Sequence, residues 1–157
     1  MITFKQDPQN KKVFLKIERM ADDILYAVER AYLDVGHLLR DSLQKGLKFG
    51  KRRGRTYTHF KNGRYIKRQS SAPGEYPQRI YGVLRGAVAF TVLSHKQMVF
   101  GIKNPGKGGV DTEYAEELEN GSSRIKKRKL VGYTVNKEAT ATRNLFIKKI
   151  DEEVKKL

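Results

Sequence analysis

The 157-residue sequence contains no cysteine and no tryptophan, and only four prolines and three histidines. Without cysteine the chain has no disulfide scaffold, no thiolate zinc site and no cysteine nucleophile. The three histidines are spread along the chain and show no metal-ligand spacing. We therefore expect no metal site and no cofactor.

Long hydrophobic runs are missing as well. No stretch approaches the roughly 18 apolar residues that a membrane-spanning helix requires, and the first 14 residues lack the apolar core of a signal peptide. We therefore expect no membrane segment and no export by that route. With 38% hydrophobic residues, the chain is sized for a single domain over residues 1–157 with a modest core.

Positive charge, by contrast, is abundant and concentrated. The chain carries 33 Lys and Arg against 17 Asp and Glu, a formal net charge of +16. Residues 48–68 hold nine basic and no acidic residues, and residues 124–129 (RIKKRK) add five more. Two basic segments on an otherwise nearly neutral chain predict a surface directed at a polyanionic or acidic partner.

A long amphipathic helix is the first predicted element. Residues 1–12 are polar and predict a flexible arm, after which apolar residues recur at steps of three and four from Val13 to about Lys45. Such a helix exceeds the width of a small domain, so we expect part of its apolar stripe to face a neighbouring subunit. Gly36 could bend it, and Gly46 and Gly50 are expected to end it.

A basic hairpin extension is predicted over residues 48–70. Asn62-Gly63 lies between runs of aromatic and β-branched residues, which is typical of a type I′ turn. The basic residues alternate with Tyr57, Phe60 and Tyr65. This combination could neutralise phosphates and stack on bases. The alternative is that the aromatic side chains pack onto the domain.

The remaining elements are shorter. We predict a loop over 70–77, a short helix within 78–87, strands over 89–94 and 98–102, an acidic helix over 112–119, a strand over 130–135 and a final helix over 138–154. This order predicts an α+β fold with a long N-terminal helix, a small antiparallel sheet with a protruding basic β-hairpin, and a C-terminal helix.

The sequence contains little evidence of a catalytic site. The acidic helix carries a local group of four carboxylates, Glu113, Glu116, Glu117 and Glu119. The first three share one side of the helix and have no histidine among them, which is typical of a solvated face. The glycine-rich stretch 101–109 lacks the Gly-Lys-Ser/Thr of a phosphate-binding loop. We therefore expect no enzymatic activity.

Two short stretches resemble a family of tailed-phage proteins. SAPGEYP (71–77) followed by YGVLRGA (81–87) is similar to the pattern SAPGE-x-P … TG-x-LR-x-S of the neck, or head–tail joining and tail-completion, proteins of long-tailed phages. YAEELENGS (114–122) resembles that family's second signature, YA-x-x-x-E-x-GT. Tyr81 and Ala87 depart from the Thr and Ser of the first pattern. The long N-terminal helix and the C-terminal helix fit the family.

The resemblance implies a structural virion protein that joins the head connector to the tail as a ring subunit around the DNA channel. Its partners would be the connector or head-closure ring, the tail terminator and DNA in the channel. A hexamer is expected, with a dodecamer as the alternative, located in the virion and, during assembly, in the host cytoplasm. The other candidates are a stand-alone basic nucleic-acid-binding protein and, third, an enzyme acting on nucleic acid.

The candidate residues fall into two groups. Those expected to contact a partner or DNA are Lys51, Arg52, Arg53, Arg55, Lys61, Arg64, Lys67, Arg68, Lys126, Lys127, Arg128 and Lys129. Those expected to shape the two motifs are Pro73, Gly74, Gly82, Leu84, Arg85, Tyr114, Glu119 and Gly121. Among the second group, Gly82 is expected to allow close backbone approach together with Gly86. Arg85 is expected to meet the carboxylate of Glu119, and Gly121 to end the acidic helix.

Overall fold

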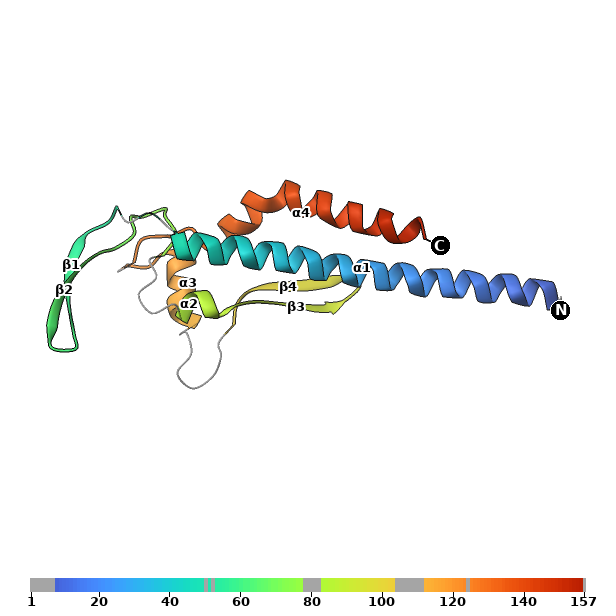
Figure 1. The fold of residues 1–157 in the computed structure, drawn as a ribbon, viewed down its shortest axis with the longest axis horizontal. Coiled ribbons are helices and arrows are strands. Elements are labelled where there is room, and N and C mark those ends of the chain that lie inside the picture. The colour runs from blue at the N-terminus through green and yellow to red at the C-terminus, as the bar shows by residue number, and fades with distance from the viewer. Residues whose placement is uncertain are drawn as a thin grey trace.

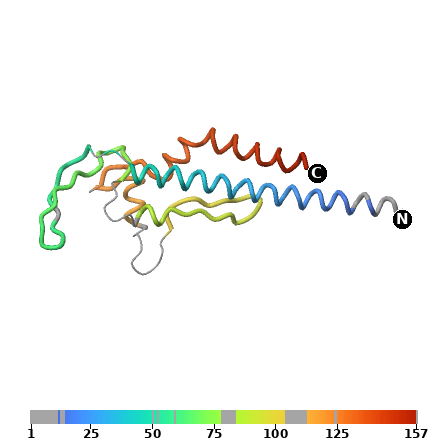
Figure 2. The backbone as a smooth tube through the Cα atoms, viewed as in Figure 1, coloured from blue at the N-terminus to red at the C-terminus, as the bar shows by residue number. Residues whose placement is uncertain are grey.

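The computed structural model describes residues 8–49, 51, 53–77, 83–103, 112–123 and 125–156. Figures 1 and 2 show one long helix, α1, that runs through the molecule with the other elements arranged along it. The elements are α1 (Pro8–Phe49), β1 (Thr56–Lys61), β2 (Arg64–Gln69), α2 (Val83–Gly86), β3 (Val88–Ser94), β4 (Gln97–Ile102), α3 (Thr112–Asn120) and α4 (Val131–Val154). The fold is α+β, as the sequence predicts.

Helix α1 is longer than predicted at both ends. It begins at Pro8, so residues 8–12 are helical and only residues 1–7 of the expected arm lie outside the described part. It continues through Gly46 to Phe49, so Gly46 does not end it. At about 1.5 Å per residue, its 42 residues span roughly 63 Å. Figure 1 shows its N-terminal part extending beyond both α4 and the β3–β4 sheet.

Helix α4 and the β3–β4 sheet pack on different sides of α1 (Figure 1). On the α4 side, the rings of Tyr32 and Phe146 lie 5.0 Å apart, and Lys149 Nζ lies 3.3 Å from the Asp34 carboxylate. The main core lies where α1 meets the smaller elements near its C-terminal end. It consists of Leu43, Leu47, Val88, Ala115, Leu118 and Leu130. Among the described side chains of α1, the hydrophobic stripe is buried only from Ala27 onward.

The strands form two separate two-stranded antiparallel sheets, β1–β2 and β3–β4. The strands predicted at 89–94 and 98–102 are confirmed to within one residue. The short helix predicted within 78–87 is present as α2, over Val83–Gly86. Residues 78–82 lie outside the described part of the chain, and β3 begins at Val88.

The strand predicted over 130–135 is wrong, because these residues begin helix α4 at Val131. Val131, Tyr133 and Val135 favour strands by intrinsic propensity. Two contacts override this preference: the Glu119 carboxylate accepts hydrogen bonds from the first backbone N–H groups of the helix, and Thr134 donates to the carbonyl of Leu130. The helix therefore starts seven residues before the predicted position at 138.

Gly36 lies where α1 contacts β3, and the space beside it is filled by an aromatic ring. A Cβ at this position would lie 2.2 Å from the ring of Phe90 on β3. That ring also lies edge-on to His37, with 5.0 Å between the two ring centroids. The absence of a side chain therefore lets the β3–β4 sheet approach α1 closely.

We expect Gly36→Ala to destabilise the protein. Overpacking costs about 1–3 kcal/mol, and the gain in helix propensity returns about 1 kcal/mol. Because the 2.2 Å approach is far inside van der Waals contact, we expect the upper part of the overpacking range and a net loss of about 1–2 kcal/mol. This lowers the melting temperature by about 2–8 °C. Gly86→Ala is the matched control, since a Cβ at Gly86 meets nothing within 4 Å. A Gly36→Ala protein that melts at or above the wild-type temperature would contradict the Phe90 contact.

Candidate functional site

The predicted hairpin is present as β1 and β2, and its turn has the expected geometry. Asn62 and Gly63 both adopt positive φ, at 50° and 73°. The strands pair in an unbroken register from Thr56 opposite Gln69 to Lys61 opposite Arg64. Figure 1 shows the hairpin projecting beyond the C-terminal end of α1, away from the rest of the molecule.

The register sorts the hairpin's side chains onto two faces, because alternate residues of a strand point to opposite sides. Phe60 and Tyr65 are directly opposite each other and share one face with Lys67. Their rings lie 5.0 Å apart, yet Phe60 is 59% and Tyr65 77% exposed. These two rings therefore contact each other in solvent and do not pack into the core. The other face carries Tyr57, Lys61, Arg64, Ile66 and Arg68.

Most of the candidate contact residues are at the surface. Arg68, Arg128 and Lys129 are half-buried, and Arg52 lies outside the described residues. The exposed residues are Lys51, Arg53, Arg55, Lys61, Arg64, Lys67, Lys126 and Lys127.

The two basic segments, far apart in sequence, meet at the base of the hairpin. The loop 71–77 lies between them and bonds to both neighbours through its backbone and side chains. Gly74 N–H donates to the carbonyl of Lys127 at 3.0 Å, and Lys129 N–H donates to the carbonyl of Glu75 at 3.1 Å. On the hairpin side, Arg53 Nε lies 3.9 Å from Glu75 Oε1. We call the surface formed by residues 51–70 and 126–129 the basic end.

The first motif forms the loop that joins these segments. Gly74 adopts φ +74°, a conformation that favours glycine. The Glu75 carboxylate accepts a hydrogen bond from the N–H of Ala72 at 2.8 Å, which closes the loop over Pro73. Leu84, after the loop, packs against the main core. Gly82 lies outside the described residues, and Gly86 has open space around it, so close backbone approach at Gly86 is a wrong prediction.

The second motif anchors helix α4 through Glu119. Its two oxygens accept hydrogen bonds from Val131 N–H at 2.8 Å and Gly132 N–H at 2.9 Å. The expected Arg85–Glu119 ion pair is therefore wrong: it is absent from the ion pairs of the described residues, because the backbone of α4 already occupies the carboxylate. Gly121 ends α3 as predicted, with φ +82° and its N–H bonded to the carbonyl of Glu117 at 2.8 Å.

Arg128 differs from its basic neighbours. Its Nη1 is buried and has no hydrogen-bond partner within the part of the chain that the structure describes. Its positive charge acts on Tyr114, whose side chain is 46% exposed. Burial raises the pKa of the Tyr114 hydroxyl, and the Arg128 charge opposes this rise. The Arg128 guanidinium is therefore partly covered by neighbouring residues, whereas Lys126 and Lys127 are exposed.

The described ranges contain no group of three or more His, Cys, Asp or Glu side chains that could hold a metal ion. Over the same ranges, no helix is both long and apolar enough to cross a membrane. What these ranges do contain is a concentration of cations and exposed rings at one end of the molecule. Chemically, this arrangement can attract and hold anionic groups.

Neither a protein-family model, nor a curated protein, nor a solved structure matches this chain. The basic end and the fold around it are therefore the basis for assigning a function.

Sequence reasoning missed four residues that surround the base of the hairpin: Lys45, Phe49, Glu75 and Tyr76. Lys45 lies on the predicted helix and Phe49 just after it, and nothing in their spacing distinguishes them from the other residues there. Glu75 and Tyr76 lie in the SAPGEYP motif, whose two prolines signal a rigid loop, and this is the one signal that could have drawn attention to them.

Proposed function

We propose that this protein is a structural subunit of a tailed-phage virion, located at the neck, where it joins the head connector to the tail. One observation carries the proposal: a small core bears two projections at opposite ends, and most of the described side chains of each projection are exposed. Each is a surface suited to assembly with other subunits.

The first projection is the N-terminal half of α1. Every described side chain from Leu15 to Tyr26 is exposed, and the large apolar ones are Leu15, Ile17, Met20, Ile24, Leu25 and Tyr26. Ile17, Met20 and Ile24 continue the stripe that Ala27 and Ala31 bury further along the helix. An apolar stripe that runs from the core into solvent favours packing against a neighbouring subunit. This supports a homo-oligomeric ring, with a hexamer as the proposed form and a dodecamer as the alternative.

The second projection is the basic hairpin β1–β2. Its cations and the exposed Phe60–Tyr65 pair suit contact with an acidic surface of a connector, head-closure or tail-terminator ring, or with DNA in the channel. The resemblance of the two motifs to neck proteins agrees with this assignment, since the motifs build the base from which the hairpin projects.

The experiment is electron microscopy of lysates in which this gene alone is disrupted in the phage or prophage that carries it. We expect filled heads and separate tails that do not join, and joined particles again when the gene is supplied in trans. Normal virions from the disrupted phage would overturn the neck assignment.

A stand-alone nucleic-acid-binding protein is the second candidate, favoured by the exposed ring pair beside Lys67 on one hairpin face. This reading requires that the purified protein binds DNA without other virion components. The logarithm of its binding constant should then fall with the logarithm of salt concentration, by roughly 0.9 for each phosphate contacted on a duplex.

A further inference from the structure

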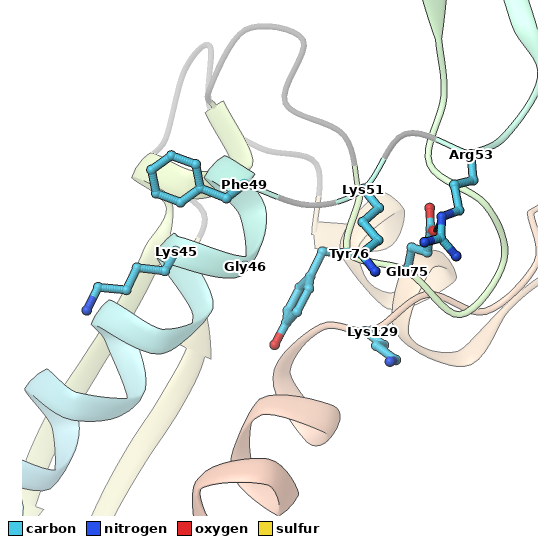
Figure 3. A pocket seen from close by; sticks show the side chains of 8 residues that line it. All are labelled: Lys45, Gly46, Phe49, Lys51, Arg53, Glu75, Tyr76 and Lys129. Atoms are coloured by element: carbon cyan, nitrogen blue, oxygen red, sulfur yellow. Dashed lines mark ion pairs between the residues drawn. The ribbon is translucent and has the colours of Figure 1, made fainter.

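A pocket of about 460 Å³ opens at the base of the hairpin, where α1 ends and α4 begins. Its size lies in the range of small-ligand sites. Its walls come from three separate parts of the chain, residues 45–53, 75–76 and 129, shown in Figure 3, so it exists only in the folded protein. The lining residues are Lys45, Gly46, Phe49, Lys51, Arg53, Glu75, Tyr76 and Lys129.

The pocket is positively charged. Figure 3 shows the cationic ends of Lys51, Arg53 and Lys129 on one side of the Tyr76 ring, with Lys45 on the other. Glu75 is the single carboxylate of the lining, and Arg53 together with the Ala72 N–H engages both of its oxygens. Neither Lys51 nor Lys129 takes part in an ion pair with another described residue. The Lys129 ammonium lies 4.3 Å from the centroid of the Tyr133 ring, a cation–π contact that holds it near the pocket but does not neutralise its charge. No carboxylate among the described residues therefore neutralises these two charges before an anion enters the pocket.

The wall between these cations is rigid and aromatic. The Tyr76 ring packs against Gly46, where a Cβ would lie 2.5 Å from it. Its hydroxyl is hydrogen-bonded to Thr134 Oγ1 at 3.2 Å, and its ring lies edge-on to Tyr133 at 5.7 Å. At the rim, Phe49 is 71% exposed. A ring held in place in this way is a preformed part of the site, which reduces the entropy lost on binding.

We propose that this pocket binds a phosphate group of a nucleic-acid backbone, with Lys51 and Lys129 around the phosphate and the ring of Tyr76 against the adjoining sugar or base. The combination of cations with aromatic platforms favours a nucleic-acid strand over an acidic protein segment, which has no comparable ring or sugar face to stack. The inference deepens the proposed function and rests on it for the source of the strand, the DNA of the neck channel.

Fluorescence anisotropy with a labelled 30-base-pair DNA duplex and a labelled 30-mer of thymidine tests the site in the full-length protein. The Lys51→Gln, Lys129→Gln double variant should bind the preferred DNA about tenfold more weakly. The plot of the logarithm of the binding constant against the logarithm of salt concentration should become less steep by about 1, the value for one lost phosphate contact. If the protein prefers the duplex, the ligand is a backbone phosphate of double-stranded DNA. If it prefers the thymidine 30-mer, the ligand is a single strand whose bases stack on the aromatic side chains.

The matched control is Lys96→Gln, Lys155→Gln, which removes the same charge from exposed positions outside the basic end. The control should keep the wild-type slope, and both variants should keep the wild-type circular dichroism spectrum. Equal losses in the two double variants would overturn the proposal, because net charge alone would then explain the binding. Binding of a poly-glutamate peptide that depends on Lys51 and Lys129 as strongly as DNA binding does would overturn it in favour of an acidic protein partner.

The outcomes separate this inference from the proposed function. If DNA binding is unchanged in the double variant while the disrupted phage still fails to join heads to tails, the pocket assignment is wrong and the neck assignment stands. If DNA binding falls as expected while the disrupted phage assembles normal virions, the phosphate site stands and the neck assignment is wrong.

Discussion

The combined substitutions Arg55→Glu, Arg64→Glu and Lys67→Glu are expected to leave the protein folded and to reduce joined phage particles by at least about a hundredfold. All three side chains are exposed on the basic end, and no ion pair among the described residues involves them. Like charges placed against an acidic partner or against DNA phosphates cost several kcal/mol, and each 1.4 kcal/mol is a factor of ten. Complementation of the disrupted phage, scored by plaque titre and by electron microscopy, measures the effect.

A charge-matched variant separates the location of the charge from its total. Lys96→Glu, Arg143→Glu and Lys155→Glu change the net charge by the same amount at exposed positions on the β3–β4 turn and on or after α4. This control should complement the disrupted phage as well as the wild-type gene does. Equal titres from the two triple variants would show that the hairpin is not the joining surface, provided that both proteins melt at the wild-type temperature.

Glu119→Ala is expected to give a large loss of stability for the substitution of a charged residue in the two motifs. The carboxylate accepts hydrogen bonds from Val131 N–H and Gly132 N–H, and it places a negative charge at the N-terminus of α4. Because hydrogen bonds to a charged group are worth about 1.5–3 kcal/mol each, we expect a loss of about 3 kcal/mol. That corresponds to a melting temperature lower by about 6–12 °C. Thermal denaturation followed by circular dichroism measures it.

Two further substitutions test whether this loss comes from the helix terminus. Glu119→Gln keeps one carbonyl oxygen as an acceptor and should lose about half as much stability. Glu116→Ala, which removes an exposed carboxylate one turn earlier on α3, should have little effect. Hydrogen exchange at Val131 and Gly132 should accelerate in Glu119→Ala. Unchanged exchange there would mean that α4 keeps its start without this carboxylate.

Local sequence patterns predicted the structure correctly where the residues of a single segment determine its conformation. The spacing of apolar residues predicts α1 because a helix brings every third or fourth residue to one side. Asn62-Gly63 predicts the hairpin because few other pairs accept positive φ at both positions, and Gly121 predicts the end of α3 for a related reason.

The sequence-based predictions were wrong where contacts between distant segments determine the local structure. Residues 130–135 look like a strand, but the Glu119 carboxylate provides a fixed start for a helix there. Arg85 and Glu119 looked like an ion pair from their motif positions, yet the same carboxylate is already engaged by α4. Gly46 looked like a helix end, whereas its missing side chain makes room for the Tyr76 ring.

The same division holds for the candidate site. The concentration of positive charge in two segments, and the alternation of cations with rings in one of them, follow from the order of residues along the chain, because charge and strand alternation are local properties. The meeting of those segments around Glu75, the burial of the Arg128 Nη1 atom and the pocket lined by Lys51, Tyr76 and Lys129 arise only in the tertiary structure. They depend on ion pairs, hydrogen bonds and packing between residues more than 20 positions apart, and no local pattern encodes such contacts.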